Sequence, residues 1–328
     1  MLLLNKEDIK KIFTMKDAIE SVKEAFVIYS EGRCDNPLRT NINVEKHNGS
    51  LLFMPAYVED LDYASLKVIN TYPDNIDRGL ATSIAQVILI DAKTGQIIAL
   101  LDGSYVTQLR TGAASGAAFD VLARKDAKIG ALIGTGGQAA AQLEAMLSVR
   151  DLELVKVYDL VADRRNEFAK TMNEELARYN TQIVAASSAD EAVEDADLLI
   201  TVTPSKKPVF DASKLKPGIT VSCVGSFQPD MQEMDPLLLS RASKIYFDSK
   251  SAVLEESGDI INPLKDGLIS EDDITGELGE LLSGRIAGRE KDEEIIVFKT
   301  VGIGTQDLVT AKNIYEKAIA AGIGTKWS

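Results

Sequence analysis

The sequence predicts an α/β fold in which a Rossmann-type doubly wound parallel sheet is inserted into an α+β domain made from the two ends of the chain. Three observations favour this fold. A glycine-rich turn joins a strand pattern to a helix pattern at residues 128–147, strand and helix patterns alternate after it, and β-type stretches precede it at residues 40–101. The length of 328 residues, 45% of them hydrophobic, is sufficient for two domains.

The elements follow in a clear order. Apolar residues recur at helical spacing from residue 5 to 31, and residues 14–18 are expected to divide this run into two helices. Residues 40–101 contain four strand patterns, typical of a mainly antiparallel sheet, with DAKTG as a hairpin turn. A helix of small residues, LRTGAASGAAFDVLA, comes next. The alternating segments are KIGALIG, QAAAQLEAMLSV, LELVKVYDL, ADRRNEFAKTMNEELARY, TQIVAAS, SADEAVEDA, DLLITVTP, GITVSCVG and KIYFDS. Residues 276–328 are expected to form an amphipathic helix, a strand and a last helix from about Gln306 to Ala321.

This order predicts two domains and limits the partners. We expect residues 114–303 to form the dinucleotide-binding domain, and residues 1–113 with 304–328 to form one outer domain. A net charge of −14 repels nucleic-acid phosphates and anionic lipids, and no apolar run has the length of a membrane span, so no nucleic-acid or membrane partner is expected. Two cysteines are too few for a disulfide framework, which favours a cytoplasmic location. No metal site is predicted.

The glycine-rich turn is the first chemical signal. Its pattern G-x-G-x-x-[GA] allows a tight turn at the first glycine and a close approach to a pyrophosphate at the second, and the helix N-terminus behind it attracts phosphate charge. A purely structural glycine turn is the alternative. The residues that fit the pattern are Gly134, Thr135, Gly136, Gly137, Gln138 and Ala139.

An acid at the end of the next strand strengthens the signal. Asp159 follows Gly136 by 23 residues, where a carboxylate accepts hydrogen bonds from the adenosine ribose. The acid favours NAD over NADP, because a 2'-phosphate would meet its negative charge. Arg164 and Arg165 could pair with that phosphate, so NADP stays possible. Further cofactor contacts are expected at Thr203, Val224 and Gly225.

Five ordered stretches are distributed over almost the whole chain: SLKVINTYPDN, QLRTGAASGAA, ALIGTGGQAAAQLEA, ELGELLSGRIAGR and VGIGTQDLVTA. Through these stretches the chain resembles the ornithine cyclodeaminase/mu-crystallin family over almost its whole length. The resemblance implies a homodimer whose outer domain binds substrate and forms the dimer contact. It also implies that Lys67, Arg110 and Arg39 hold a substrate carboxylate, and that Asp307 lies near the nicotinamide. The alternative for Lys67 and Arg110 is an ordinary internal ion pair, or a side chain that extends its charged end to solvent.

The sequence departs from the family pattern at residues 222–235. Cyclodeaminases and alanine dehydrogenases of the family generally have an aspartate two residues after a glycine, but here Gly225 is followed by Ser226 and Phe227. Phe227 cannot act as the carboxylate base that oxidation of a free amino acid requires. Leu52 similarly stands where a cyclodeaminase has an acid for the distal amine. Both changes make the substrate pocket more apolar.

These features predict an NAD(P)H-dependent reductase of a small cyclic imino acid, of the Δ1-pyrroline-2-carboxylate or Δ1-piperideine-2-carboxylate type. Lys67 and Arg110 are the predicted catalytic residues, and the proton comes from solvent, buffer or Lys67. The alternatives are an ornithine cyclodeaminase, an alanine- or opine-type amino-acid dehydrogenase, and a non-catalytic binding protein similar to mu-crystallin. The single histidine, His47, is expected in an exposed turn.

Overall fold

The structure, a computed structural model, describes residues 1–327, and the chain divides into two compact units. We call Met1–Arg110 with the chain from Ile303 onward the terminal unit, and Thr111–Gly302 the central unit. The sequence analysis expected these boundaries after residues 113 and 303.

The central unit contains a parallel sheet. Within the described residues its eight strands lie in the order β13-β12-β14-β11-β10-β7-β8-β9, and every neighbouring pair is parallel. The run β9-β8-β7-β10-β11 is the strand order of a doubly wound dinucleotide-binding sheet, so the predicted Rossmann-type fold is confirmed. The strands are β7 (Ile129–Ile133), β8 (Leu154–Tyr158), β9 (Gln182–Ala185), β10 (Leu198–Thr201), β11 (Thr220–Cys223), β12 (Lys244–Phe247), β13 (Gly276–Glu277) and β14 (Ile296–Lys299).

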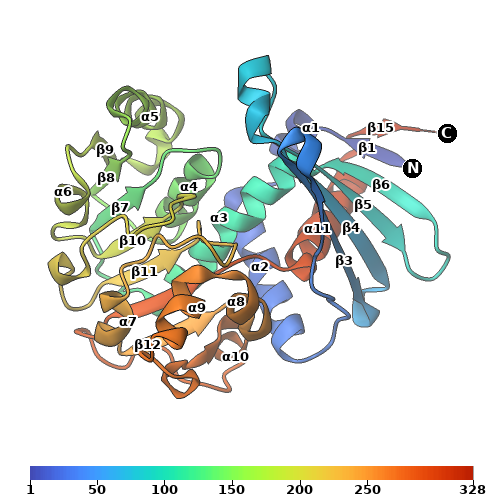
Figure 1. Ribbon diagram of the computed structural model, residues 1–328. Helices are drawn as coiled ribbons and strands as arrows, with labels where there is room; N and C mark the ends of the chain where they lie inside the picture. The colour runs from blue at the N-terminus through green and yellow to red at the C-terminus, as the bar shows by residue number, and fades with distance from the viewer. Residues whose placement is uncertain (328) are drawn as a thin grey trace. The chain divides into compact units, whose positions relative to one another are not determined.

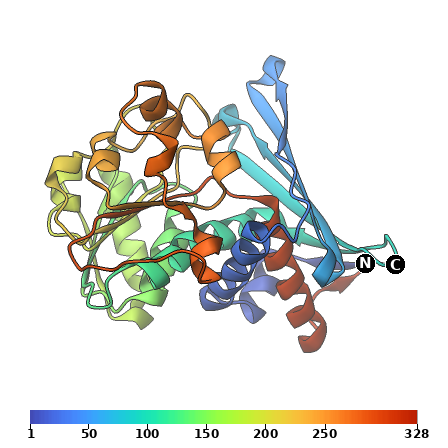
Figure 2. The same cartoon turned by 90° about the horizontal axis from the view of Figure 1, so that it is seen from below.

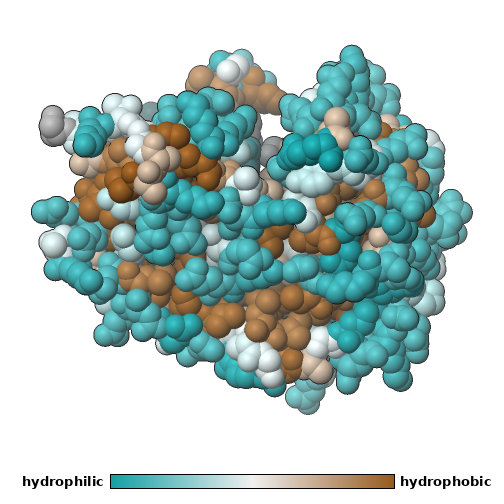
Figure 3. All heavy atoms as spheres, turned by 180° about the vertical axis from the view of Figure 1, so that it is seen from behind, coloured by the Kyte–Doolittle hydropathy of each residue, from teal (hydrophilic) through white to brown (hydrophobic). Residues whose placement is uncertain are grey.

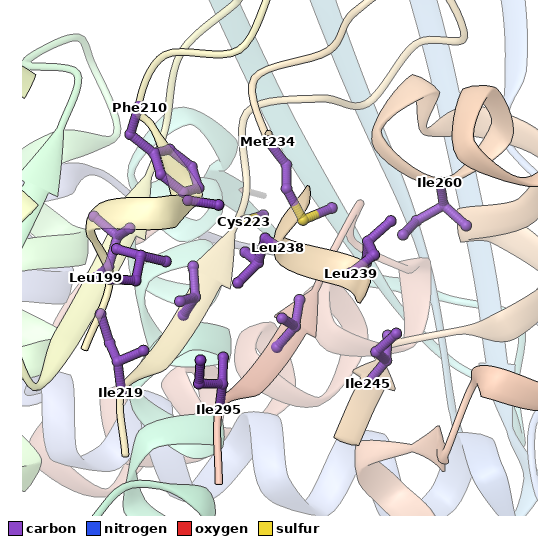
Figure 4. Close-up of a cluster of buried hydrophobic side chains, with 14 of the residues drawn as sticks. Leu199, Phe210, Ile219, Cys223, Met234, Leu238, Leu239, Ile245, Ile260 and Ile295 are labelled. Carbon is purple, nitrogen blue, oxygen red and sulfur yellow. The ribbon is translucent and has the colours of Figure 1, made fainter. Parts of the chain in front are cut away.

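Helices cover both faces of this sheet (Figure 1). One face packs against α3, α4 and α5 through residues such as Phe119, Leu143 and Met172. The opposite face forms the cluster in Figure 4, with Leu199 and Ile245 from the strands and Leu238 from α7. The helices are α3 (Gly103–Leu122), α4 (Ala139–Val149), α5 (Ala162–Glu175), α6 (Ala189–Val193), α7 (Leu237–Arg241), α8 (Lys250–Glu256), α9 (Gly258–Lys265) and α10 (Leu278–Leu282). The short helices α8 and α9 were not among the predicted elements, and Pro263 inside α9 obscures its helical pattern.

The terminal unit contains a mainly antiparallel sheet, as predicted. Its strands lie in the order β15-β1-β6-β5-β4-β3-β2, and the pairs from β2 to β6 are antiparallel. Strand β1 instead runs parallel to β6 and antiparallel to β15, and both of these short strands escaped the sequence analysis. The strands are β1 (Leu2–Leu4), β2 (Thr40–Val44), β3 (Gly49–Val58), β4 (Tyr63–Thr71), β5 (Ser83–Asp91), β6 (Ile97–Asp102) and β15 (Thr325–Lys326).

The helices α2 and α11 lie on one side of this sheet, as Figure 2 shows. The predicted break in the first helical run is present, because α1 ends at Ile12 and Thr14 caps a new helix by accepting a hydrogen bond from the Asp17 amide. Ala56 and Val58 of β3 pack with Ile28 of α2 and Leu308 of α11. The helices of this unit are α1 (Lys6–Ile12), α2 (Met15–Ser30) and α11 (Gly304–Ala321).

The surface shown in Figure 3 is mostly hydrophilic, with hydrophobic patches between the charged side chains. Over residues 1–327, none of the helices combines the length and the apolar character that crossing a membrane requires.

Candidate functional site

A buried ion pair in the terminal unit unites two of the predicted site residues. Lys67 lies in the middle of β4, opposite Met54 of β3 and Val87 of β5. Its side chain is 1% exposed, and its Nζ lies 2.6 Å from Oδ2 of Asp307, which is in the first turn of α11. The strand places Lys67 on the sheet face that packs against α11, because alternate residues of a strand face the same side.

Arg110 of α3 binds the same carboxylate from its other oxygen. Its Nε donates a hydrogen bond of 3.1 Å to Oδ1 of Asp307, and its side chain is 7% exposed. Asp307 therefore bridges Lys67, which lies 240 positions before it in the sequence, and Arg110, which lies 197 positions before it. The two predicted carboxylate-binding cations are thus adjacent, and the internal ion pair considered from the sequence is present as well.

This cluster carries an excess of buried positive charge. When Lys67 is protonated, Lys67 and Arg110 supply two positive charges, and the buried Asp307 supplies one negative charge. Burial, followed by the charge of Arg110, lowers the pKa of Lys67 from 10.5 to about 7, although Asp307 opposes this shift. The positive charge of Arg39 lowers the same pKa further. Because an uncompensated charge is costly in a buried site, the cluster favours an anionic ligand.

Leu52 lies two residues before Met54 in β3 and on the same sheet face, and Met54 is the direct cross-strand neighbour of Lys67. Leu52 is partly buried. An apolar side chain in this position adds no competing negative charge to the cation cluster. The apolar substrate pocket expected from the sequence stays a prediction.

The start of α11 is fixed by a residue that the sequence analysis missed. Oδ1 of Asn36 accepts hydrogen bonds from the Thr305 amide at 2.8 Å and from its hydroxyl at 2.9 Å. A Cβ on Gly304 would lie 2.8 Å from the Pro55 carbonyl oxygen, so only glycine fits there without displacement. Asn36 and Thr305 are 269 residues apart, so no local spacing could reveal the pair.

The predicted phosphate-binding turn lies in the central unit between β7 and α4. Gly134 has a φ of +102°, and a Cβ there would lie 2.7 Å from the Val202 carbonyl oxygen. A Cβ on Gly136 or Gly137 would meet nothing within 4 Å, so there is open space beside these residues. Such space at the N-terminus of α4 fits a pyrophosphate group. Gln138 precedes the helix and Ala139, its first residue, is fully buried.

Asp159 follows β8 and its carboxylate turns toward this glycine turn. Oδ2 accepts hydrogen bonds from the amide and hydroxyl of Thr135 at 3.1 and 2.9 Å, and Oδ1 accepts one from the Val161 amide at 2.9 Å. Partial burial raises the pKa of Asp159, but these hydrogen bonds outweigh it and bring the pKa below its ordinary value. Arg164 lies 3.6 Å from Oδ2 with its side chain 56% exposed. Asp159 is therefore an ionised acid at neutral pH.

The remaining predicted cofactor residues follow the next two strands. Thr203 comes after β10, and Val224 and Gly225 come directly after β11. The Glu233 carboxylate binds the amides of both Thr203 and Gly225. Sequence reasoning did not single out Glu233, because Asp230 and Asp235 lie within three residues of it and nothing in the local pattern distinguishes it from them.

Phe227 lies in the loop after β11 of the central unit and is 37% exposed. Asp307, expected near the nicotinamide, lies in the terminal unit between Lys67 and Arg110. His47 ends a short 3-10 turn and is exposed, as the sequence indicated. Neither Cys34 nor Cys223 is part of a disulfide bond.

The chain is similar to known proteins in sequence and in fold over nearly its whole length. A Δ1-pyrroline-2-carboxylate reductase from Bacillus cereus is 39% identical over 326 residues, which is 99% of each chain. The structure of Thermococcus litoralis Δ1-pyrroline-2-carboxylate reductase in complex with NADH and L-proline matches with a TM-score of 0.95 and 43% identity over both whole chains. An archaeal alanine dehydrogenase dimer with bound NAD matches with a TM-score of 0.91 and 36% identity, covering 100% of this chain and 99% of the other.

The sequence model of the ornithine cyclodeaminase/mu-crystallin family matches residues 1–322. The five sequence stretches on which the resemblance was based all lie within that range. The chain belongs to the ornithine cyclodeaminase/mu-crystallin family.

Proposed function

We propose that this protein is an NADH-dependent reductase that converts a small cyclic imino acid of the Δ1-pyrroline-2-carboxylate type into the cyclic amino acid. One observation carries the proposal: Lys67 and Arg110 are buried with one carboxylate between them, so the cluster has a positive charge left for a substrate carboxylate. Relatives with 39% and 43% identity across the whole chain are reductases of this substrate.

The substrate chemistry fits the residues of the terminal unit. A cyclic imino acid has one strongly charged group, its carboxylate, and an otherwise apolar ring. Lys67 and Arg110 bind the carboxylate, with Arg39 as a third cation, while Leu52 contributes apolar surface. Asp307 neutralises part of the positive charge and fixes the directions of Lys67 Nζ and Arg110 Nε.

The reaction reduces one C=N bond. The bound dinucleotide supplies the hydride that the imine carbon accepts, and the ring nitrogen takes a proton. Lys67 is the proton donor in this proposal, because a pKa of about 7 allows it to carry a proton at neutral pH and to release it readily. Solvent then returns a proton to its Nζ.

The central unit provides the cofactor site in this proposal. The pyrophosphate binds in the open space beside Gly136 and Gly137, and the Asp159 carboxylate accepts hydrogen bonds from the adenosine ribose. Because hydrogen bonds keep Asp159 ionised, its negative charge opposes the extra phosphate of NADPH. NADH is therefore the preferred reductant.

We further propose that the protein is a homodimer, joined through the sheet of the terminal unit. Helices cover one face of this sheet, and the opposite face presents a cross-strand row of apolar residues, Pro55, Leu66, Ile88 and Leu100, that stay partly exposed. Such a patch favours association with a second copy. A related alanine dehydrogenase is described as a dimer. The cytoplasmic location stays a prediction.

The reductase proposal is tested by following NADH absorbance with Δ1-pyrroline-2-carboxylate, Δ1-piperideine-2-carboxylate, and pyruvate with ammonia. Rapid NADH oxidation with a cyclic imine is the expected result, and NADPH should be used less well. Ornithine serves as the contrasting substrate: ammonia and proline formed without net nucleotide turnover would indicate a cyclodeaminase. Tight NADH binding with no turnover of any of these compounds would instead indicate a binding protein.

A further inference from the structure

A buried acid that the proposed mechanism does not use joins two of the predicted cofactor segments. Glu233 is fully buried. Its Oε2 accepts hydrogen bonds from the Thr203 amide at 2.7 Å and the Thr203 hydroxyl at 2.9 Å, and its Oε1 accepts one from the Gly225 amide at 2.6 Å. Thr203 follows β10 and Gly225 follows β11, so this one side chain ties the exits of two adjacent strands together.

The tied segments are also in direct contact with the glycine turn. A Cβ on Gly225 would lie 2.1 Å from the Thr203 carbonyl oxygen, and a Cβ on Gly134 would lie 2.9 Å from Cγ2 of Thr203. No side chain fits between these backbones. A shift of the Thr203 segment would therefore also displace the backbone at Gly134 and at Gly225.

A second pair of buried charges holds Glu233 in place from behind. Oδ1 of Asp259 accepts hydrogen bonds from the amides of Glu233 and Met234 at 2.8 and 2.9 Å, while its Oδ2 pairs with Nζ of Lys299 at 3.1 Å. Asp259 and Lys299 are both buried. Figure 4 shows Met234, Cys223 and Ile260 in the adjacent apolar cluster. We call Glu233, Asp259 and Lys299 the buried brace.

The sheet topology relates this brace to one half of a dinucleotide. The glycine turn follows β7, and the ribose-binding acid Asp159 follows β8, on one side of β7. Strands β10 and β11 lie on the other side of β7. Because a dinucleotide crosses the carboxyl edge of such a sheet at the point where strand order reverses, its nicotinamide half lies over β10 and β11.

We propose that Glu233 is a positioning residue for the nicotinamide half of the cofactor, acting through Thr203 and Gly225. The inference rests on the proposed use of NADH and adds a residue that sets the shape of that site. The Glu233 side chain is buried, and its carboxylate accepts hydrogen bonds from both cofactor segments. Its carboxylate suits this task because every group that it meets in these segments is a hydrogen-bond donor.

The test compares two ligands on one variant, Glu233→Gln. Both carboxylate oxygens of Glu233 accept hydrogen bonds, but a glutamine has an NH2 donor in place of one of them. That NH2 group would face a donor of Thr203 or of Gly225, so one of the two segments loses its hydrogen-bond acceptor. We expect the Kd for NADH to rise about tenfold or more, the effect of losing one charge-assisted hydrogen bond. The Kd for ADP-ribose, which lacks the nicotinamide, should change by less than about threefold, a shift of under ~0.7 kcal/mol. Titration calorimetry measures both.

A matched control is available at the opposite edge of the same sheet. The buried carboxylate of Asp197 accepts hydrogen bonds from the amides of Lys128 and Ile129, where β7 begins. Asp197→Asn removes a comparable backbone brace far from the carboxyl edge. We expect it to lower the melting temperature while both ligands bind as they do to the wild-type protein.

The outcomes separate the inference from the proposed function. NADH and ADP-ribose weakened equally in Glu233→Gln, or neither weakened, would overturn the positioning role and leave the reductase proposal standing. Failure of the wild-type protein to bind NADH would instead remove the proposed function. If Glu233→Gln does not fold, Glu233→Asp takes its place: it keeps the charge but is one methylene too short to reach both segments, so the same loss of NADH affinity is expected.

Discussion

At the residue scale, Lys67 combines two properties that are rarely found together. Its side chain is buried in the middle of a strand, and its counter-ion, Asp307, also pairs with Arg110. Burial and the second cation lower its pKa to about 7, so a small change of pH alters its charge. In the proposed reaction, the same lysine therefore links substrate binding to proton supply.

This pKa gives the first prediction. The protonated form of Lys67 binds the carboxylate and donates the proton, so kcat/KM should fall as pH rises through about 7. Lys67→Met should reduce kcat/KM by about 100-fold or more and abolish that descending limb. The measurement is kcat/KM from pH 5.5 to 9 in both proteins. An unchanged pH profile in Lys67→Met would remove the lysine from the mechanism.

Asp307 provides the second prediction. Asp307→Asn leaves Lys67 and Arg110 buried without a counter-charge, which should lower the free energy of unfolding by about 3–5 kcal/mol. The matched control is Asp62→Asn, which breaks the exposed ion pair with Lys93. Solvent screens that pair, so the loss should be much smaller. Urea unfolding of both variants at pH 7 measures the difference, and equal losses would contradict the buried-charge argument.

Asp159 provides the third prediction, on cofactor choice. Asp159→Ser removes the negative charge that opposes a 2'-phosphate and leaves Arg164 near the same place. The ratio of kcat/KM for NADPH to that for NADH should rise by about tenfold, corresponding to ~1.4 kcal/mol. Asp163→Ser, at an exposed position in the first turn of α5, is the control and should leave the ratio unchanged. A ratio that does not move in Asp159→Ser would show that another residue selects the cofactor.

At the scale of elements, the placement of α11 decides the geometry of the proposed substrate site. Its first two turns are buried, Gly304 permits close approach to the Pro55 carbonyl, and Asn36 accepts two hydrogen bonds from Thr305. Asp307 lies less than one turn beyond these contacts. A small displacement of the helix start would therefore move the carboxylate that orients both cations.

Asn36→Ala is the fourth prediction. Loss of the two hydrogen bonds should lower the free energy of unfolding by ~1 kcal/mol and also reduce kcat/KM by about tenfold. Asn5→Ala removes a comparable contact, the hydrogen bond from the Asp8 amide that begins α1. It should lower stability by a similar amount without reducing kcat/KM. A normal kcat/KM in Asn36→Ala would show that α11 keeps its place without this contact.

At the scale of the whole molecule, the proposed homodimer forms through the face of the terminal sheet that no helix covers. Ile88→Glu places a charge in the centre of the row formed by Pro55, Leu66, Ile88 and Leu100. The fifth prediction is that this variant is a monomer by sedimentation, because a buried unpaired carboxylate opposes the contact. Ile319→Glu, at an exposed position on α11, is the control and should remain a dimer. A dimeric Ile88→Glu would place the interface elsewhere.

The sequence by itself determined the local features of this protein. The glycine turn, the acid after the next strand, the alternation of strands and helices and the break before α2 all depend on residues close together in the chain. Hydrogen bonding and hydrophobic periodicity act over such short distances, so their signals are legible without a structure. Short elements with weak periodicity were missed, among them the strands β1, β13 and β15 and the helices α7, α8 and α9.

The tertiary structure decided which distant residues meet. Asp307 joins Arg110 over 197 positions, Asn36 joins Thr305 over 269, and the Glu233 carboxylate reaches Thr203 over 30. None of these pairs follows from spacing, because each depends on where a helix packs on a sheet or how two strand exits align. Burial then sets the chemistry: the same lysine in water would have an ordinary pKa, and only its enclosure beside Arg110 brings that pKa near neutrality.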